Sequence, residues 1–313
     1  MFDAHSDLLL DVLLHRERGK VDFMEKVILR DMRSASIRFR VLAVWIEEFY
    51  LPELALRRAL DMISAFYQES MRTDDFMLIS DSRGFERSFE QDKVGFVLAL
   101  EGAEPIYRDL NLLYIFYELG VRVITLTWNN RNYVADGIKV GGGGGLTSFG
   151  KELIKVMNEL KMVVDVSHLS EKGFWDVVEL AENVMASHSN AFSLCSHPRN
   201  LKDDQIKALA EKGGIIGITA VPHFLRDGGE ASVGDYVRHI EYVAEMVGLD
   251  NVAVGFDFVD HIPGIEDKFV DGLEGDRSVS KLGVLLEDSG FASEGVDKIL
   301  GKNLLGFFSK AFE

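Results

Sequence analysis

The sequence opens with Phe2-Asp3-Ala4-His5-Ser6-Asp7 and continues directly into Leu8-Leu9-Leu10. In an extended strand, side chains two residues apart point to the same side, so His5 and Asp7 would face one pocket. An imidazole and a carboxylate on one face suit a borderline metal such as zinc. This pattern is short, and it gains weight because later strand-like segments also end in His, Asp or Glu.

Eight segments have the apolar and β-branched composition of buried strands. Residues 94–100 are the clearest example, since nearly all of them are apolar, as in a parallel sheet that is covered on both faces. The eight segments are residues 2–7, 37–46, 94–100, 121–127, 162–166, 184–187, 214–221 and 251–256. Helical patterns alternate with them, which predicts parallel strands joined by right-handed crossovers.

Eight such units in a chain of 313 residues predict a (β/α)8 barrel of the TIM type. We expect a single domain over residues 1–313, with closing helices at 279–312. A doubly wound open sheet is the alternative. It does not explain why polar candidates recur at almost every strand end, whereas a barrel gathers such groups at the carboxyl ends of its strands.

Charge and cysteine content limit the partners and the compartment. A net charge of −17 argues against binding to nucleic acid or to an anionic membrane surface. The single cysteine, Cys195, excludes an intramolecular disulfide and a cysteine-based metal site. The sequence has neither the basic start of a signal peptide nor a run of about 18 apolar residues. We therefore expect a cytoplasmic protein, and the oligomeric state is left open, with a homodimer as one arrangement.

In a barrel, six polar side chains would converge on one mouth. They are His5, Asp7, Glu101, His168, His188 and Asp257. Each has an ordinary structural reading when taken alone, such as a core histidine or a capping carboxylate. Together, buried charged groups need partners, and two metal ions would supply them. Glu101 would then bridge two ions about 3.5–4 Å apart, as in two-metal hydrolases.

These residues lie in motifs that resemble the membrane dipeptidase (renal dipeptidase) family of zinc peptidases, within the amidohydrolase-type barrels. The motifs are DAHSD at 3–7, LEGAE at 100–104, DVSHLS at 165–170, SHSNAFSLCSHPRN at 187–200 and VGFDF at 254–258. They run from the first predicted strand to the last. The resemblance therefore covers essentially the whole chain.

The resemblance implies a role for each motif residue. His5, Asp7 and Glu101 would hold one zinc ion, and Glu101, His168 and His188 would hold the other; cobalt or manganese could replace zinc. Arg199 would bind the substrate carboxylate. Asp257 would take part in proton transfer or amine recognition, and a water bridging the two metals would attack the dipeptide.

One position departs from the family pattern. Well-known animal members carry a histidine after the Leu-Thr of the fourth strand, placed to stabilise the tetrahedral intermediate. Here Trp128 follows Leu126-Thr127, and an indole can donate a hydrogen bond but cannot exchange a proton as imidazole does. Either Trp128 or Asn129 replaces that donor, or turnover is low, or the substrate differs.

A metallo-dipeptidase is thus the leading hypothesis. Another amide or ester hydrolase on the same scaffold is the first alternative, because fold alone does not fix chemistry. A metal-binding homologue with weakened activity is the second, and Trp128 motivates it. Three further histidines, His197, His223 and His261, fall in predicted loops after strands, where solvent exposure is the default expectation.

Overall fold

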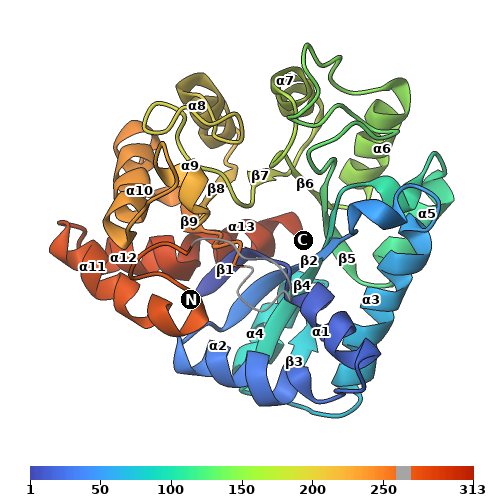
Figure 1. Cartoon of the computed structure of the whole chain (residues 1–313), viewed down its shortest axis with the longest axis horizontal. Coiled ribbons are helices and arrows are strands. Elements are labelled where there is room, and N and C mark those ends of the chain that lie inside the picture. The colour runs from blue at the N-terminus through green and yellow to red at the C-terminus, as the bar shows by residue number, and fades with distance from the viewer. Residues whose placement is uncertain (259–268) are drawn as a thin grey trace.

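The computed structural model describes residues 1–258 and 269–313, and its core is a closed ring of parallel strands (Figure 1). The strands are β1 (Phe2–Ser6), β2 (Phe39–Trp45), β3 (Phe76–Leu78), β4 (Val94–Glu101), β5 (Val121–Thr125), β6 (Val163–Asp165), β7 (Val184–Ala186), β8 (Ile215–Ile218) and β9 (Val252–Val254). The strand order is β2-β1-β9-β8-β7-β6-β5-β4-β3. Because β2 also pairs with β4, eight strands close into a ring, and β3 lies outside it, beside β4. The predicted (β/α)8 barrel is confirmed.

Helices surround this ring, as Figure 1 shows. The α-helices are α1 (Leu8–Glu17), α2 (Arg30–Ser34), α3 (Ala55–Ser70), α4 (Ser82–Glu90), α5 (Leu110–Glu118), α6 (Ser148–Glu159), α7 (Glu171–Leu180), α8 (Asp203–Glu211), α9 (Pro222–Leu225), α10 (Val233–Val247), α11 (Leu282–Asp288), α12 (Ser293–Asp297) and α13 (Asn303–Ala311). Side chains at several helix starts accept a hydrogen bond from the first turn, as Thr147 does from Gly150 and Ser170 from Gly173.

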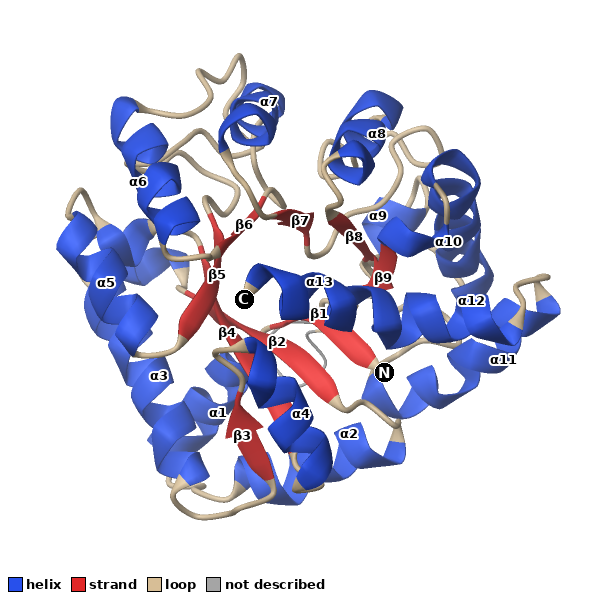
Figure 2. Cartoon of the chain, turned by 180° about the vertical axis from the view of Figure 1, so that it is seen from behind, coloured by secondary structure: helices blue, strands red, loops and turns tan. Residues whose placement is uncertain are grey.

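The last helix, α13, covers the end of the barrel opposite to the strand carboxyl ends. Figure 2 shows it lying across the ring of strands from behind. Its Phe308 stacks on Phe2 with ring centroids 5.5 Å apart, and both belong to a buried cluster that fills this end. The barrel is therefore sealed on one side, which leaves the opposite mouth for a site.

One short strand differs from the predictions. Strand β3 pairs in parallel with the first residues of β4, and the capped helix α4 follows it. β3 is not among the eight predicted strands, because three residues are too few to show a period. Between β1 and β2 the chain forms α1, the π-helical turn η1 (Met24–Leu29) and α2.

A buried ion network ties the start of the chain to its end. On β2, Arg40 donates to Asp3 of β1 at 2.9 Å and to both oxygens of Asp276, which begins the 3-10 helix η5 (Asp276–Lys281). The other oxygen of Asp3 accepts from the backbone N–H of Phe256 at 3.0 Å. Asp3 thus fixes β1 against the segment that follows β9, directly under the barrel mouth.

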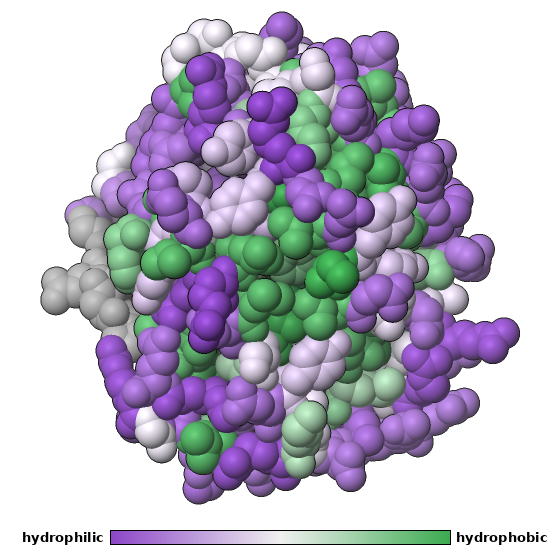
Figure 3. Space-filling view, turned by 90° about the vertical axis from the view of Figure 1, so that its right-hand side faces the viewer, coloured by the Kyte–Doolittle hydropathy of each residue, from purple (hydrophilic) through white to green (hydrophobic). Residues whose placement is uncertain are grey.

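An apolar area lies on the side of the molecule where α3 and α5 lie (Figure 3). Figure 3 shows green residues gathered at the middle of this face. Exposed large apolar side chains on these two helices include Leu60, Tyr114 and Ile115. Within the described residues, no helix has the length and apolar character that crossing a bilayer requires.

Candidate metal centre and substrate cavity

The six predicted site residues lie together at the carboxyl ends of the barrel strands. His5 is in β1 and Asp7 follows it, while Glu101 is the last residue of β4. His168, His188 and Asp257 lie two or three residues beyond the ends of β6, β7 and β9. Strand pairing aligns these ends, so residues separated by up to 252 positions reach one place.

Glu101 lies at the centre of this group. Its Oε1 is 3.0 Å from Nε2 of His168 and 3.7 Å from Nε2 of His188, and its Oε2 is 3.3 Å from Nε2 of His5. Asp257 approaches His5 from the other side, with Oδ1 3.8 Å from Nε2. The two oxygens of one carboxylate therefore face different histidines.

The ring nitrogens that face Glu101 are arranged as acceptors. The Nε2 atoms of His168 and His188 lie 2.7 Å apart, so no more than one proton fits between them. The Nδ1 of His168 is 2.9 Å from Oδ1 of Asn129, and an amide oxygen only accepts, which places the proton of His168 on Nδ1. Its Nε2 then presents a lone pair toward Glu101 and His188.

Among the described residues, three sets of donor atoms lie close enough together to hold a cation. They are Glu101, His168 and His188; His5, Asp7 and Asp257; and His5, Asp165 and His188. Three atoms in these sets are buried without a hydrogen bond: Nε2 of His5, Oδ1 of Asp7 and Oε2 of Glu101. Unpaired buried polar atoms are costly, and nitrogen and carboxylate oxygen are the ligands that zinc takes in proteins. The residues present therefore fit a divalent cation.

Burial changes the acid–base behaviour of these groups. It raises the pKa of Asp7 and of Glu101 to about 8 and that of Asp257 well above its usual range. Burial also lowers the pKa values of His168 and His188 well below 6.5, so both imidazoles are neutral at physiological pH. Neutral imidazoles are the form that binds metals, and a nearby cation would favour the ionised carboxylates.

Two residues of the site have a left-handed backbone. The φ angle is 66° at His168 and 60° at Asp257. Non-glycine residues seldom adopt this region, and they do so mainly where surrounding structure and function require it. The turn at each position directs the side chain back over the barrel mouth.

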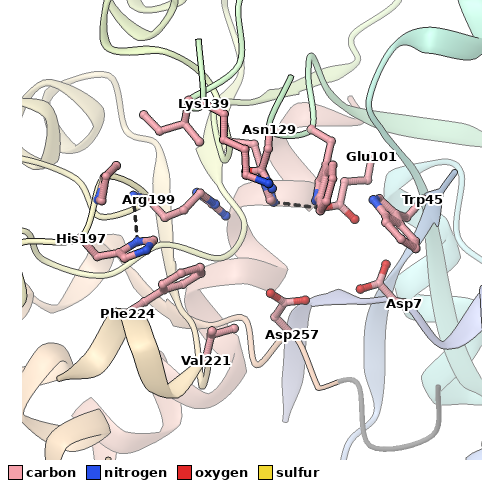
Figure 4. Close-up of a pocket in the computed structure, with 14 residues that line it drawn as sticks. Asp7, Trp45, Glu101, Asn129, Lys139, His197, Arg199, Val221, Phe224 and Asp257 are labelled. Carbon is pink, nitrogen blue, oxygen red and sulfur yellow. Dashed lines mark hydrogen bonds and ion pairs between the residues drawn. The ribbon is translucent and has the colours of Figure 1, made fainter. Parts of the chain in front are cut away.

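A cavity of about 630 Å³ opens beside the histidines (Figure 4). Its walls combine acidic, basic and aromatic side chains, and they include Asp7, Trp45, Glu101, Trp128, Asn129, Lys139, His168, Arg199, Phe224 and Asp257. In Figure 4, Arg199 reaches in from one side, and the carboxylates of Glu101, Asp7 and Asp257 lie on the other. A cavity of this size accommodates a small polar ligand.

Arg199 is a buried cation in the wall of the cavity. It is 7% exposed, its Nη2 donates to the backbone oxygen of His188 at 3.3 Å, and its Nε makes no hydrogen bond. Within residues 1–258 and 269–313, no carboxylate lies at ion-pair distance from its guanidinium, and burial lowers its pKa to about 10. A buried cation in this setting favours an anionic group in the cavity.

Trp128 and Asn129 occupy different positions in the cavity wall. Trp128 is half-buried, packs edge-on against Trp45 with centroids 5.4 Å apart, and has Nζ of Lys139 5.2 Å from its ring centroid. The oxygen of Asn129 accepts from His168, while its amide nitrogen belongs to the group that lines the cavity. Trp128 is thus part of an aromatic wall.

The three loop histidines differ from one another. His223 is exposed, as expected, whereas His197 is half-buried, lines the cavity and lies 4.4 Å from the ring of Phe224. His261 lies outside the described residues. Sequence reasoning did not identify Trp45, Lys139 or Phe224 as lining residues; the position of Trp45 at the end of β2 is the one signal that could have indicated it.

Comparison with known proteins agrees with this geometry. A family model described as "Membrane dipeptidase (Peptidase family M19)" matches residues 1–312. A Klebsiella pneumoniae protein, described as an uncharacterized protein in the pqqA 5′ region, is 37% identical over 231 residues, which are 70% of this chain and 83% of that protein.

Two solved structures are similar over their whole length. The structure of a metallopeptidase named dipeptidase AC has a TM-score of 0.90 and 25% identity, covering 99% of this chain and 98% of the other. A metallopeptidase from Rhodobacter sphaeroides, bound to a phosphinate mimic of L-Ala-D-Ala, has a TM-score of 0.90 and 25% identity, covering 100% and 99%.

Proposed function

The chain belongs to the membrane dipeptidase family, peptidase family M19, and is a dipeptide-hydrolysing metalloenzyme; from that premise we propose that it uses two divalent cations, preferably zinc. His5, Asp7 and Glu101 would hold one cation, and Glu101, His168 and His188 would hold the other. The observation that carries this proposal is the carboxylate of Glu101, whose two oxygens face different histidines. When bound, such a pair supplies an activated water and polarises the scissile carbonyl.

Arg199 would bind the free carboxylate of the dipeptide. Its guanidinium is buried and faces the cavity, and a planar guanidinium can form two parallel hydrogen bonds to a carboxylate. Binding at this end of the cavity would orient the peptide bond toward Glu101.

Asp257 would accept a proton or bind the substrate amine. Burial raises its pKa well above the usual range, which favours the protonated form and suits a carboxyl group that takes up a proton. Its position in the donor set with His5 and Asp7 also fits a further ligand for the first cation, beside His5, Asp7 and Glu101. Replacement by Asn, with metal content measured beside kcat, separates the two roles.

At the position of the family's histidine, we propose that the amide nitrogen of Asn129 or the indole N–H of Trp128 donates to the developing oxyanion. Both side chains line the cavity beside His168. This supports a working enzyme over a homologue with weakened activity, the alternative that Trp128 suggested.

A turnover screen tests the proposal. Protein stripped of metal and reloaded with zinc, cobalt or manganese is assayed on L-L and L-D dipeptides, and N-acetylated amides and lactones serve as alternative substrates. We expect dipeptides to be cleaved and activity to return with two equivalents of metal. Hydrolysis of the amides or lactones without dipeptide cleavage would favour another amidohydrolase activity. Cytoplasmic location and a homodimeric state stay predictions.

A further inference from the structure

Asp165, at the end of β6, is a buried carboxylate that lies next to the metal-ligand candidates. Both of its oxygens already accept two hydrogen bonds each. Its Oδ1 accepts from the backbone N–H groups of Ser167 at 3.0 Å and Ser187 at 2.9 Å. Its Oδ2 accepts from the hydroxyls of Thr125 at 2.7 Å and Ser187 at 2.6 Å. Although it groups geometrically with His5 and His188, four hydrogen bonds leave it no lone pair for a cation.

The hydroxyl of Ser187 connects this carboxylate to two histidines. Its oxygen is 2.7 Å from Nδ1 of His188 and 3.3 Å from Nδ1 of His5. A serine has one proton to donate, and a carboxylate is a stronger acceptor than an imidazole nitrogen. The proton therefore points to Asp165, and the oxygen of Ser187 can only accept from both rings.

This arrangement fixes which ring nitrogen carries the proton. If Nδ1–H of His188 and of His5 both donate to Ser187, both Nε2 atoms present lone pairs toward Glu101. The two histidines are assigned to different cations, so one hydroxyl acts on both proposed sites. His168 has a separate partner, because its Nδ1 faces Asn129.

We propose that Asp165 and Ser187 are positioning residues that hold His5 and His188 in the metal-binding tautomer, which links the two cation sites through one hydroxyl. The proposal rests on the dinuclear function proposed above. Hydrogen-bond partners behind metal-binding histidines typically change metal affinity by about 10- to 100-fold. Ser187 and Asp165 are each 1% exposed, so water does not replace either of them.

The sharpest variant is Asp165→Asn, which keeps the shape but can present an N–H to Ser187. The hydroxyl proton of Ser187 would then turn toward His188, and the proton of the imidazole would move to Nε2. Ser187→Ala removes the acceptor altogether. Ser189→Ala is the matched control, because Ser189 is also buried, lies two residues away, and has a hydroxyl without a hydrogen bond.

Tautomers are read by long-range ¹H–¹⁵N NMR of metal-free protein at pH 8, where an unperturbed imidazole is neutral. We expect Nδ1–H forms for His5, His168 and His188 in the native sequence. Asp165→Asn should convert His5 and His188 to the Nε2–H tautomer and leave the tautomer of His168 unchanged. Ser189→Ala should change the tautomer of none of the three histidines. Conversion of His168 as well would mean general disruption and would overturn the proposal, as would unchanged tautomers for His5 and His188.

Chelator competition with zinc gives the second readout. We expect the dissociation constants for both equivalents to rise about 10- to 100-fold in Asp165→Asn and Ser187→Ala. A loss at one equivalent alone would refute the shared role of Ser187. If the native protein binds no second cation, the dinuclear function fails, while the NMR result still decides whether Asp165 and Ser187 set the tautomers.

Discussion

Oε1 of Glu101 lies 3.0 Å from Nε2 of His168, although the two residues come from strands on opposite sides of β5. Both groups are buried, and the same carboxylate also faces His5 and His188. Glu101 is therefore the residue whose loss should affect both cation sites.

Glu101→Gln should lower the metal content from two equivalents to one or fewer, because an amide is a poor replacement for a bridging carboxylate. Activity on dipeptides should fall with it. Glu104→Gln is the control, since Glu104 lies in a separate surface hollow with Asn132 and Tyr133. Elemental analysis after reconstitution provides the measurement. A native ratio near one would contradict the dinuclear assignment.

Arg199→Lys should raise KM for free dipeptides by about 10- to 100-fold, since a charge-assisted hydrogen bond contributes about 1.5–3 kcal/mol. Lysine keeps the positive charge but cannot form the two parallel hydrogen bonds that a guanidinium makes to a carboxylate. C-terminally amidated dipeptides, which lack the carboxylate, serve as the internal comparison and should be nearly unaffected. Equal losses on both substrates would assign Arg199 a structural role.

Trp128→His should leave metal content unchanged and alter kcat by far less than the 10²–10³-fold associated with a positioned oxyanion donor. The reason is that Asn129 also lines the cavity beside Trp128. Trp45→Phe controls for damage to the aromatic wall that both tryptophans form. A large increase in kcat would show that the native protein lacks a donor, and loss of metal or folding would make Trp128 a packing residue.

Asp276→Asn should destabilise the fold by about 3–5 kcal/mol, because it weakens a buried pairing with Arg40, a residue 236 positions away. The control is Asp61→Asn, which breaks the exposed Arg57–Asp61 pair on α3 and should leave the free energy of unfolding nearly unchanged. Urea unfolding measures both. Similar values for the two variants would mean that Asp276 contributes little to the network.

Strand ends were predictable because their signal is local. Glu101 follows seven residues that are almost all apolar, and parallel strands place their carboxyl ends together without further information. The same reasoning located His5, Asp7, His168, His188 and Asp257. To bring these residues to one place, that reasoning needed only the number of strands and their parallel direction.

Pairings between distant parts of the chain were not predictable. Arg40 is one polar residue in an apolar strand, and nothing nearby indicates Asp276 as its partner. Lys139 and Phe224 reach the cavity from loops whose course depends on tertiary contacts. Asp165 and Ser187 lay within recognised motifs, yet their hydrogen bonds to each other and to two histidines became visible only when β6 and β7 were side by side.

The left-handed backbone at His168 and Asp257 sets stability against activity in this protein. Each such residue costs on the order of 1–3 kcal/mol, which the rest of the barrel must offset. Glycine at either position would relieve that cost and remove a side chain that we assign to the site. Variants ranked by melting temperature alone would therefore be enriched in inactive enzymes at these two positions, and a thermostabilisation library should hold both fixed.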